Sequence, residues 1–197
     1  NRLGVVLDAS HGSDDVLRDL LALSRAPVML SHSDCRALCD HPRNVGDELL
    51  QALAAKGGVI QINALPISLV EAPGNGRTAA GAEVLLRYKD TVVSPAMLEA
   101  EGRDYDQVAL DHPNPRATLD DFVRHIEHAA KVAGGEHIGI GCDLDGGGGA
   151  FDGLRDVADF PNITRALLAR GWQEPALAAL WGGNTLRLLR AVQRLGP

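Results

Sequence analysis

Polar residues follow three short apolar runs, at the point where each run would end as a β-strand. Residues 8–11 (Asp-Ala-Ser-His) close the first run, residues 31–33 (Ser-His-Ser) the second, and residues 143–146 (Asp-Leu-Asp-Gly) a later one. Because sites in α/β proteins form at the carboxyl ends of parallel strands, these segments are expected to converge. The imidazoles of His11 and His32, with a carboxylate, are ligand types of zinc and other transition metals. The pattern predicts a metal site, with helix capping and bonds to loop carbonyls as the simpler alternative.

A second set of ligand types overlaps the first. Structural zinc sites use two well-separated pairs of ligands, so four candidates compressed into one short segment fit such a site poorly. Cys35 and Cys39 lie four residues apart and are expected to share one apolar face of a helix instead. The four candidates follow the pattern His-x2-Cys-x3-Cys-x-His: His32, Cys35, Cys39 and His41.

Two other groups of candidate residues have simpler interpretations. The glycines at 146–149 are not followed by a Lys-Ser or Lys-Thr pair, which excludes a P-loop, and the later ligands of a calcium loop are missing. We expect them to form a flexible active-site loop. His125 and His128 lie three residues apart on a predicted helix, and we expect both on its exposed face.

The elements that must position these residues alternate along the chain. Four nearly unbroken apolar strands that alternate with helices are typical of a parallel sheet covered on both faces. We expect an α/β fold, the C-terminal part of a (β/α)8 TIM-type barrel with parallel strands and a C-terminal helical cap, with a doubly wound open sheet as the rival. The predicted strands are residues 4–10, 27–31, 59–63 and 137–142; the predicted helices are 13–24, 45–56, 78–86, 118–132, 163–169 and 174–193; an irregular stretch is predicted over 64–116.

Composition limits the classes of protein that this chain can represent. Its 197 residues carry 26 acidic and 19 basic side chains, and the net charge of −7 argues against a nucleic-acid-binding surface. The sequence has no apolar run of about 18 residues, so a membrane span within this chain is excluded. Three cysteines cannot all pair, which predicts reduced thiols and a cytoplasmic protein, and the composition is consistent with a bacterial source. The length predicts one domain over residues 1–197.

Several motifs together resemble a known family. The first motif runs from residues 1–4 to residues 8–11, and the second runs from residues 24–28 to residues 31–33. The others are residues 42–45, 139–146 and 183–187. On these motifs, in this order and at this spacing, the chain resembles the C-terminal half of the renal (membrane) dipeptidase family of zinc dipeptidases. The resemblance runs nearly end to end, and residues 64–116 match least.

The resemblance implies which residues would carry the reaction. His11 and His32 would be ligands of the second zinc of a binuclear site. Arg43 would grip the carboxylate of a small dipeptide substrate, a task that suits its planar bidentate guanidinium. Asp143 would bind the substrate, take a proton from the attacking water and pass it to the leaving nitrogen, with Asp145 as a neighbouring support. The implied function is zinc-dependent hydrolysis of dipeptides by a metal-activated water.

The same resemblance sets an expectation about completeness. Members of the family carry a His-x-Asp metal pair and a bridging Glu before the region where this chain begins, so only His11 and His32 have counterparts here. We expect the chain alone to bind zinc poorly and to be inactive, with a missing N-terminal half-barrel or a partner chain completing the site. A homodimer is a further expected partner state. The alternatives are a non-catalytic half-barrel subunit or pseudoenzyme, and another metal-dependent amidohydrolase.

Overall fold

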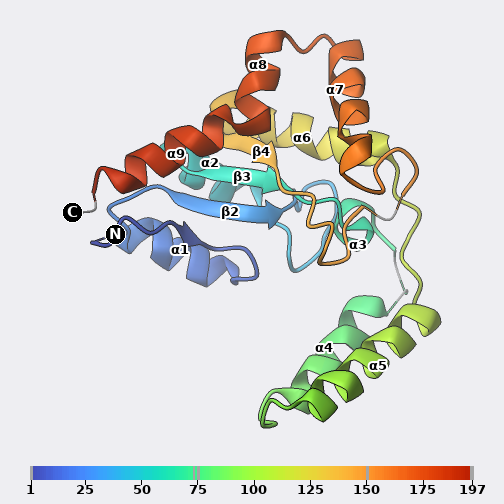
Figure 1. Ribbon diagram of the computed structural model, residues 1–197. Helices are drawn as coiled ribbons and strands as arrows, with labels where there is room; N and C mark the ends of the chain where they lie inside the picture. Colours follow the sequence, from blue (N-terminus) through green and yellow to red (C-terminus); the bar gives the residue numbers. More distant parts are fainter. Residues whose placement is uncertain (1, 73, 75, 150, 196–197) are drawn as a thin grey trace. The chain divides into compact units, whose positions relative to one another are not determined.

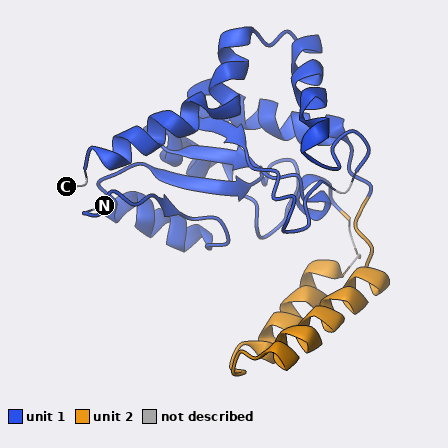
Figure 2. Ribbon diagram, in the orientation of Figure 1, with its two compact units in different colours: residues 1–71, 116–197 blue, residues 72–115 orange. Residues whose placement is uncertain are grey.

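The computed structural model describes residues 2–72, 74, 76–149 and 151–195. It divides into two compact units, which are coloured separately in Figure 2. Unit 1 comprises Asn1–Glu71 and Arg116–Pro197, and unit 2 comprises Ala72–Pro115. The expectation of a single domain over residues 1–197 stays a prediction.

Unit 1 contains a four-stranded parallel sheet (Figure 1). Its strands are β1 (Leu7–Asp8), β2 (Val28–Ser33), β3 (Val59–Ile62) and β4 (Ile138–Ile140), and they lie side by side in chain order. A doubly wound sheet reverses its strand order at a switch point, whereas consecutive strands of a (β/α)8 barrel follow one another in order. The order β1-β2-β3-β4 therefore confirms the barrel-type prediction over the rival.

Helices cover one side of this sheet through a continuous apolar core. Leu30, Ile60 and Ile138 lie opposite one another on β2, β3 and β4, and each is at most 2% exposed. They pack in one cluster with side chains of the helices that connect the strands, among them Phe122 of α6. Figure 1 shows α2 and α6 together along this side. The connecting helices are α1 (Asp14–Leu23), α2 (Asp47–Ala55), α3 (Pro66–Leu69) and α6 (Leu119–Ala133), followed by the short η1 (Gly135–His137).

The C-terminal helices form the predicted cap. Leu188 and Val192 of the last helix pack against Val59 in a second, smaller cluster, and Gln61 of β3 donates to Thr185 (3.1 Å). The single helix predicted over 174–193 is wrong, because the backbone at Gly182 leaves the helical range and splits it. The cap comprises η2 (Val157–Asp159), α7 (Phe160–Ala169), α8 (Glu174–Ala178), η3 (Ala179–Gly183) and α9 (Asn184–Gln193).

Unit 2 is a helical hairpin of α4 (Arg77–Tyr88) and α5 (Pro95–Asp111). The helix predicted over 78–86 is confirmed as α4, whereas the irregular stretch predicted over 64–116 is wrong where α5 forms. Pro95 is the first residue of α5. It occupies the first turn of α5, where proline is tolerated, and the Ser94 hydroxyl caps the helix by accepting from the amide of Met97 (3.2 Å). Proline marks a helix start here instead of a break.

Buried polar groups beneath the sheet correct the expectation for the two helix histidines. His125 of α6 is 1% exposed; its Nδ1 accepts from the amide of Cys35 (3.1 Å), and its Nε2 donates to the carbonyl of Leu69 (3.0 Å). Burial lowers the pKa of His125 to about 4, so the ring is neutral. His128 is half-buried, with its Nε2 2.8 Å from the carboxylate of Asp47. The buried amide of Cys35 needs an acceptor and the carbonyl of Leu69 needs a donor, and a neutral histidine provides both.

Among the helices that the described residues form, none combines the length and the apolar character that a membrane crossing requires.

Candidate functional site

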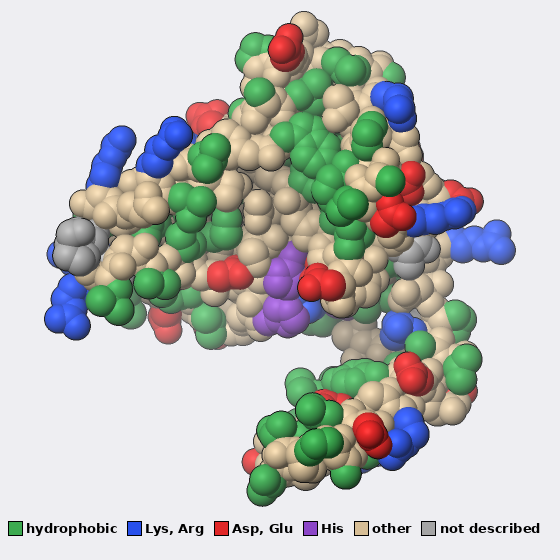
Figure 3. All heavy atoms as spheres, viewed as in Figure 1, with side chains coloured by type: hydrophobic (Ala, Val, Ile, Leu, Met, Phe, Trp, Pro, Cys, Tyr) green, Lys and Arg blue, Asp and Glu red, His purple; other side chains and the backbone are tan. Residues whose placement is uncertain are grey.

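The predicted site residues lie at or just beyond the carboxyl ends of β1, β2 and β4. His32 is the penultimate residue of β2, His11 lies three residues beyond β1, and Asp143 lies three residues beyond β4. Figure 3 shows histidine side chains gathered between acidic ones on this part of the surface. The parallel order of the sheet thus brings together segments that are more than a hundred residues apart.

The rings of His11 and His32 face each other through their Nε2 atoms, which are 2.8 Å apart. The ring centroids are 4.9 Å apart and the planes are inclined by 63°. Partial burial lowers the pKa of His11, and the positive charges of Arg43 and His32 act in the same direction. A neutral imidazole with an available lone pair is the form that binds a metal ion.

Unusual backbone conformations aim two of these side chains. Among the described residues, the non-glycine residues with positive φ are His11 (69°) and Asp143 (54°). Such conformations are uncommon away from glycine and concentrate at functional sites. The turn before His11 is fixed by Asp8, whose Oδ1 accepts from the amide of Ser10 (3.0 Å). Both strained residues are ones that the sequence had marked.

The glycine-rich segment wraps around Asp143. The amides of Gly146 and Gly148 both donate to its carbonyl oxygen, at 3.0 and 2.9 Å. A Cβ atom at position 146 would lie 2.5 Å from Oδ1 of Asp143, so any other residue there would displace the carboxylate from this position. The loop therefore belongs to the site, while its flexibility stays a prediction. Asp145, the predicted neighbouring support, is exposed.

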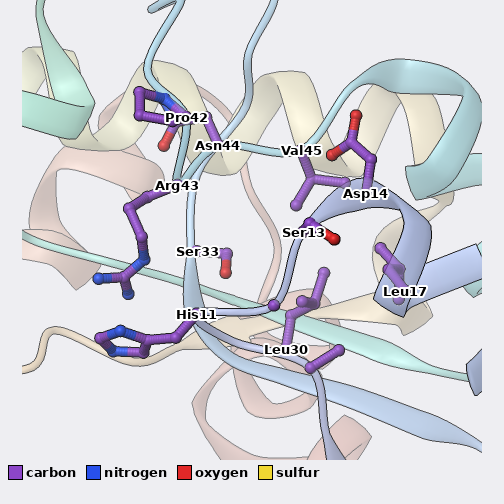
Figure 4. A pocket seen from close by; sticks show the side chains of 12 residues that line it. His11, Ser13, Asp14, Leu17, Leu30, Ser33, Pro42, Arg43, Asn44 and Val45 are labelled. Carbon is purple, nitrogen blue, oxygen red and sulfur yellow. The ribbon is translucent and has the colours of Figure 1, made fainter. Parts of the chain in front are cut away.

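Two guanidinium nitrogens of Arg43 lack hydrogen-bond partners among the described residues. They are Nε and Nη2, and both are buried. Burial lowers the pKa of Arg43, while the negative charges of Asp143 and Asp34 oppose that change. Figure 4 shows the guanidinium pointing towards the ring of His11. Buried polar groups normally have partners, so this one is suited to bind an anionic group.

The pair of histidines fits a metal ion, and the described chain brings no larger ligand set together. Two zinc–nitrogen bonds of about 2.0–2.1 Å at a tetrahedral angle hold their nitrogens about 3.3 Å apart. The 2.8 Å between the two Nε2 atoms needs to open by only about half an ångström. Within the described residues, no group of three or more His, Cys, Asp or Glu side chains is placed to hold a metal. His11 and His32 can therefore supply part of a coordination shell.

Among the described residues, no three of the ligand types in the compressed pattern, which includes Cys35, Cys39 and His41, are placed together to hold a metal. The expected helix face is wrong, however, because Cys35 bridges Val45 as an isolated β-bridge and Cys39 lies in the following turn. Both thiols are buried. Cys35 Sγ donates to the carbonyl of His125 (3.5 Å), and Cys39 Sγ donates to that of Ile67 (3.6 Å).

Sequence reasoning missed the role of Asp8 and Ser31. The Ser31 hydroxyl lies 2.8 Å from Nδ1 of His32 and donates to Asp8 Oδ2 at 2.5 Å. Both residues stood in the polar segments that the sequence marked, but a contact across 23 positions has no signature in local spacing.

Comparison with known proteins finds similarity to dipeptidases. Residues 1–196 match the model of the membrane dipeptidase family (Peptidase family M19). The chain is 32% identical to Dipeptidase 3 of Homo sapiens over 195 residues, which are 99% of this chain and 31% of that protein. It is 33% identical to an uncharacterized dipeptidase of Schizosaccharomyces pombe, over 98% of this chain and 37% of the relative.

Solved structures show the same fold. The crystal structure of the probable dipeptidase PvdM from Pseudomonas aeruginosa matches with a TM-score of 0.77 and 31% identity, over 98% of this chain and 51% of the other. A metallo peptidase from Rhodobacter sphaeroides, liganded with a phosphinate mimic of the dipeptide L-Ala-D-Ala, matches with a TM-score of 0.72 and 23% identity, over 96% of this chain and 43% of the other. The second likeness supports the fold alone. The chain spans about a third of the curated relatives and about half of these structures.

Proposed function

This chain belongs to the membrane dipeptidase family, and on that premise we propose that it supplies part of the active site of a zinc-dependent dipeptidase. The observation that carries the proposal is the opposition of the His11 and His32 Nε2 atoms, 2.8 Å apart, beside the guanidinium of Arg43, two of whose nitrogens have no hydrogen-bond partner among the described residues. Metal ligands and an anion-binding group at one site suit a small substrate that contains both a scissile amide and a free carboxylate.

His11 and His32 would hold one zinc ion of the binuclear site, with the remaining ligands supplied from outside this chain. When bound, zinc supplies a Lewis acid that lowers the pKa of water to about 7. Asp143, whose carboxylate lies next to Gly146, would accept a proton from the attacking water and deliver it to the leaving nitrogen. The charges of Asp143 and Arg43 already act on His11, which supports their sharing one site.

Arg43 would bind the C-terminal carboxylate of the dipeptide and so place the peptide bond next to the histidines. A bidentate pair between guanidinium and carboxylate fixes position as well as adding binding energy. That the buried Nε and Nη2 atoms have no partner in the part of the chain that the structure describes supports such a pair.

The test uses the protein expressed from its complete gene, in excess zinc, with a dipeptide and the same dipeptide as its C-terminal amide. We expect the wild type to prefer the free carboxylate by about 10- to 100-fold in kcat/KM, because a charge-assisted pair contributes roughly 1.5–3 kcal/mol. In Arg43→Ala this preference should disappear, mainly through a higher KM for the dipeptide. An unchanged preference in Arg43→Ala would show that another group binds the carboxylate.

A second candidate function is a non-catalytic subunit that needs a partner chain or forms a homodimer. It is favoured by the absence of any three-residue ligand group within the described residues. The zinc content and the dipeptide turnover of the purified, zinc-loaded protein, measured together, separate the two candidates. Zinc retained without dipeptide turnover favours the non-catalytic subunit, and turnover with zinc favours the enzyme. The cytoplasmic location expected from the cysteines belongs to the same proposal, and cell fractionation tests it.

A further inference from the structure

The ring of His32 is bound on its side remote from His11 by a short chain of polar groups. Its Nδ1 lies 2.8 Å from the hydroxyl oxygen of Ser31. That hydroxyl lies 2.5 Å from Oδ2 of Asp8. The chain connects a candidate metal ligand on β2 to a carboxylate at the end of β1.

The direction of these hydrogen bonds follows from the number of available protons. An ionised carboxylate only accepts, so the single hydroxyl proton of Ser31 is donated to Asp8. The Ser31 oxygen must then accept from His32, which places the ring proton on Nδ1. A neutral imidazole with its proton on Nδ1 keeps its lone pair on Nε2.

Asp8 is well fixed as the acceptor at the end of this chain. Its Oδ1 accepts from the amides of Ser10 and Ser31, each at 3.0 Å. Partial burial raises the pKa of Asp8, but the bonds from Ser31 and Ser10 outweigh that effect and lower it below its usual range. The carboxylate is therefore ionised at neutral pH.

The other end of the chain is consistent with this direction. The 2.8 Å contact between the two Nε2 atoms requires one donor and one acceptor. With its lone pair on Nε2, His32 accepts from His11. All the hydrogen bonds from His11 through His32 and Ser31 to Asp8 then run the same way.

We propose that Asp8 is a positioning residue that acts through Ser31 to hold His32 in the tautomer whose Nε2 lone pair faces the site. The inference rests on the proposed function, in which that nitrogen binds zinc. Hydrogen bonds to the second ring nitrogen of a metal-binding histidine fix its tautomer and orientation, and their loss commonly weakens metal binding about 10- to 100-fold.

The variant Asp8→Asn reverses the chain with little change in shape. The amide oxygen can still accept from the amides of Ser10 and Ser31, so the turn before His11 is retained. The new NH2 group donates to the Ser31 oxygen. The Ser31 hydroxyl proton then goes to Nδ1 of His32, which at 2.8 Å is nearer than the other available acceptor, the Ser10 hydroxyl at 3.4 Å. The ring proton moves to Nε2, where it blocks the lone pair. Asp15→Asn is the matched control, because it removes one carboxylate whose side chain is 91% exposed and pairs with Arg18.

The first readout is long-range 1H–15N correlation of 15N-histidine-labelled protein without metal, with His32 assigned from a His32→Gln spectrum. The wild type and Asp15→Asn should show His32 protonated on Nδ1, and Asp8→Asn should show it protonated on Nε2, while the backbone spectrum is retained. A wild type protonated on Nε2, or an Asp8→Asn spectrum unchanged at His32, overturns the proposal.

The second readout is the binding of Zn2+ alone, followed by calorimetry. Affinity should fall about 10- to 100-fold in Asp8→Asn, and Ser31→Thr, which keeps the hydroxyl, should stay close to the wild type. Equal zinc affinity in the wild type and Asp8→Asn contradicts the proposal. If the wild type shows the predicted tautomer but binds no zinc, the relay is supported and the proposed metal function fails, so the two failures are distinguishable.

Discussion

The two compact units differ in how much apolar surface they bury. In unit 1, side chains of β2, β3, β4 and α6 form a continuous core in which Ile60, Ile126 and Phe122 are fully buried. In unit 2, α5 has no buried residue among those described, and α4 has one, Val84. Four leucines of the hairpin are more than half exposed: Leu85, Leu86, Leu98 and Leu110.

This difference explains where precise chemistry can be located. His11, His32, Arg43 and Asp143 all belong to unit 1. Their backbone is tied to packed strands, which can hold side chains at a fixed distance and keep strained conformations such as that of Asp143. The hairpin has few buried contacts with which to fix a side chain in this way. We therefore expect substitutions in unit 1 to have larger effects than similar ones in unit 2.

The largest expected effect is on the core. Phe122→Ala should lower the free energy of unfolding by about 3–5 kcal/mol, because it opens a cavity at a fully buried position. Leu98→Ala in α5, at a position 54% exposed, should change it by less than about 0.5 kcal/mol. Urea unfolding of both variants is the measurement. Equal losses would show that the hairpin is packed as tightly as the sheet.

The second effect is the pH dependence that His125 adds to unit 1. Its pKa is about 4 in the folded protein against 6.5 as the reference, so the unfolded state binds its proton more readily. The depressed pKa of His125 adds about 3 kcal/mol to the free energy of unfolding. This stabilisation is fully present above pH 6.5 and is lost as the pH falls towards 4. Burial raises the pKa of neighbouring Asp34, which acts in the opposite direction.

Comparison with His125→Gln isolates the histidine from Asp34. The difference in unfolding free energy between the wild type and this variant should shrink as the pH falls from about 7 to about 5. A difference that stays constant over this range would mean that His125 titrates normally in the folded protein.

The third effect is on catalysis and tests the glycine next to Asp143. Gly146→Ala should lower kcat about 100-fold, because its Cβ would meet the carboxylate oxygen at 2.5 Å and displace it. Zinc binding by His11 and His32 should be unaffected. The control is Gly135→Ala, whose Cβ would meet nothing within 4 Å. Normal turnover by Gly146→Ala would show that the carboxylate position is not critical.

The smallest effect belongs to unit 2. Gly102 lies inside α5, and a Cβ there would meet nothing within 4 Å. Gly102→Ala should stabilise the hairpin by about 0.5–1 kcal/mol through helix propensity alone, without changing kcat. Hydrogen exchange of the α5 amides measures this gain, and faster exchange in the variant would contradict it.

The sequence was informative where burial imposed a pattern. The strands of unit 1 were recognised because their apolar runs pack on a sheet, and His11 and His32 because they follow those strands. In unit 2 the sequence predicts α4, over residues 78–86, but not α5, because α5 buries none of its described residues and leaves no apolar face to recognise. The burial of His125 was not predicted because its partners, the amide of Cys35 and the carbonyl of Leu69, are far from it in the sequence.

The most direct test of the central claim compares dipeptide hydrolysis in excess zinc by His11→Ala, His32→Ala and, as a control from unit 2, His112→Gln, each expressed from the complete gene. If His11 and His32 hold a catalytic zinc, kcat/KM in both alanine variants should fall by about 1,000-fold or more, since the metal contributes several kcal/mol to the reaction. His112→Gln should hydrolyse the dipeptide like the wild type. Wild-type turnover by His11→Ala and His32→Ala would contradict the account.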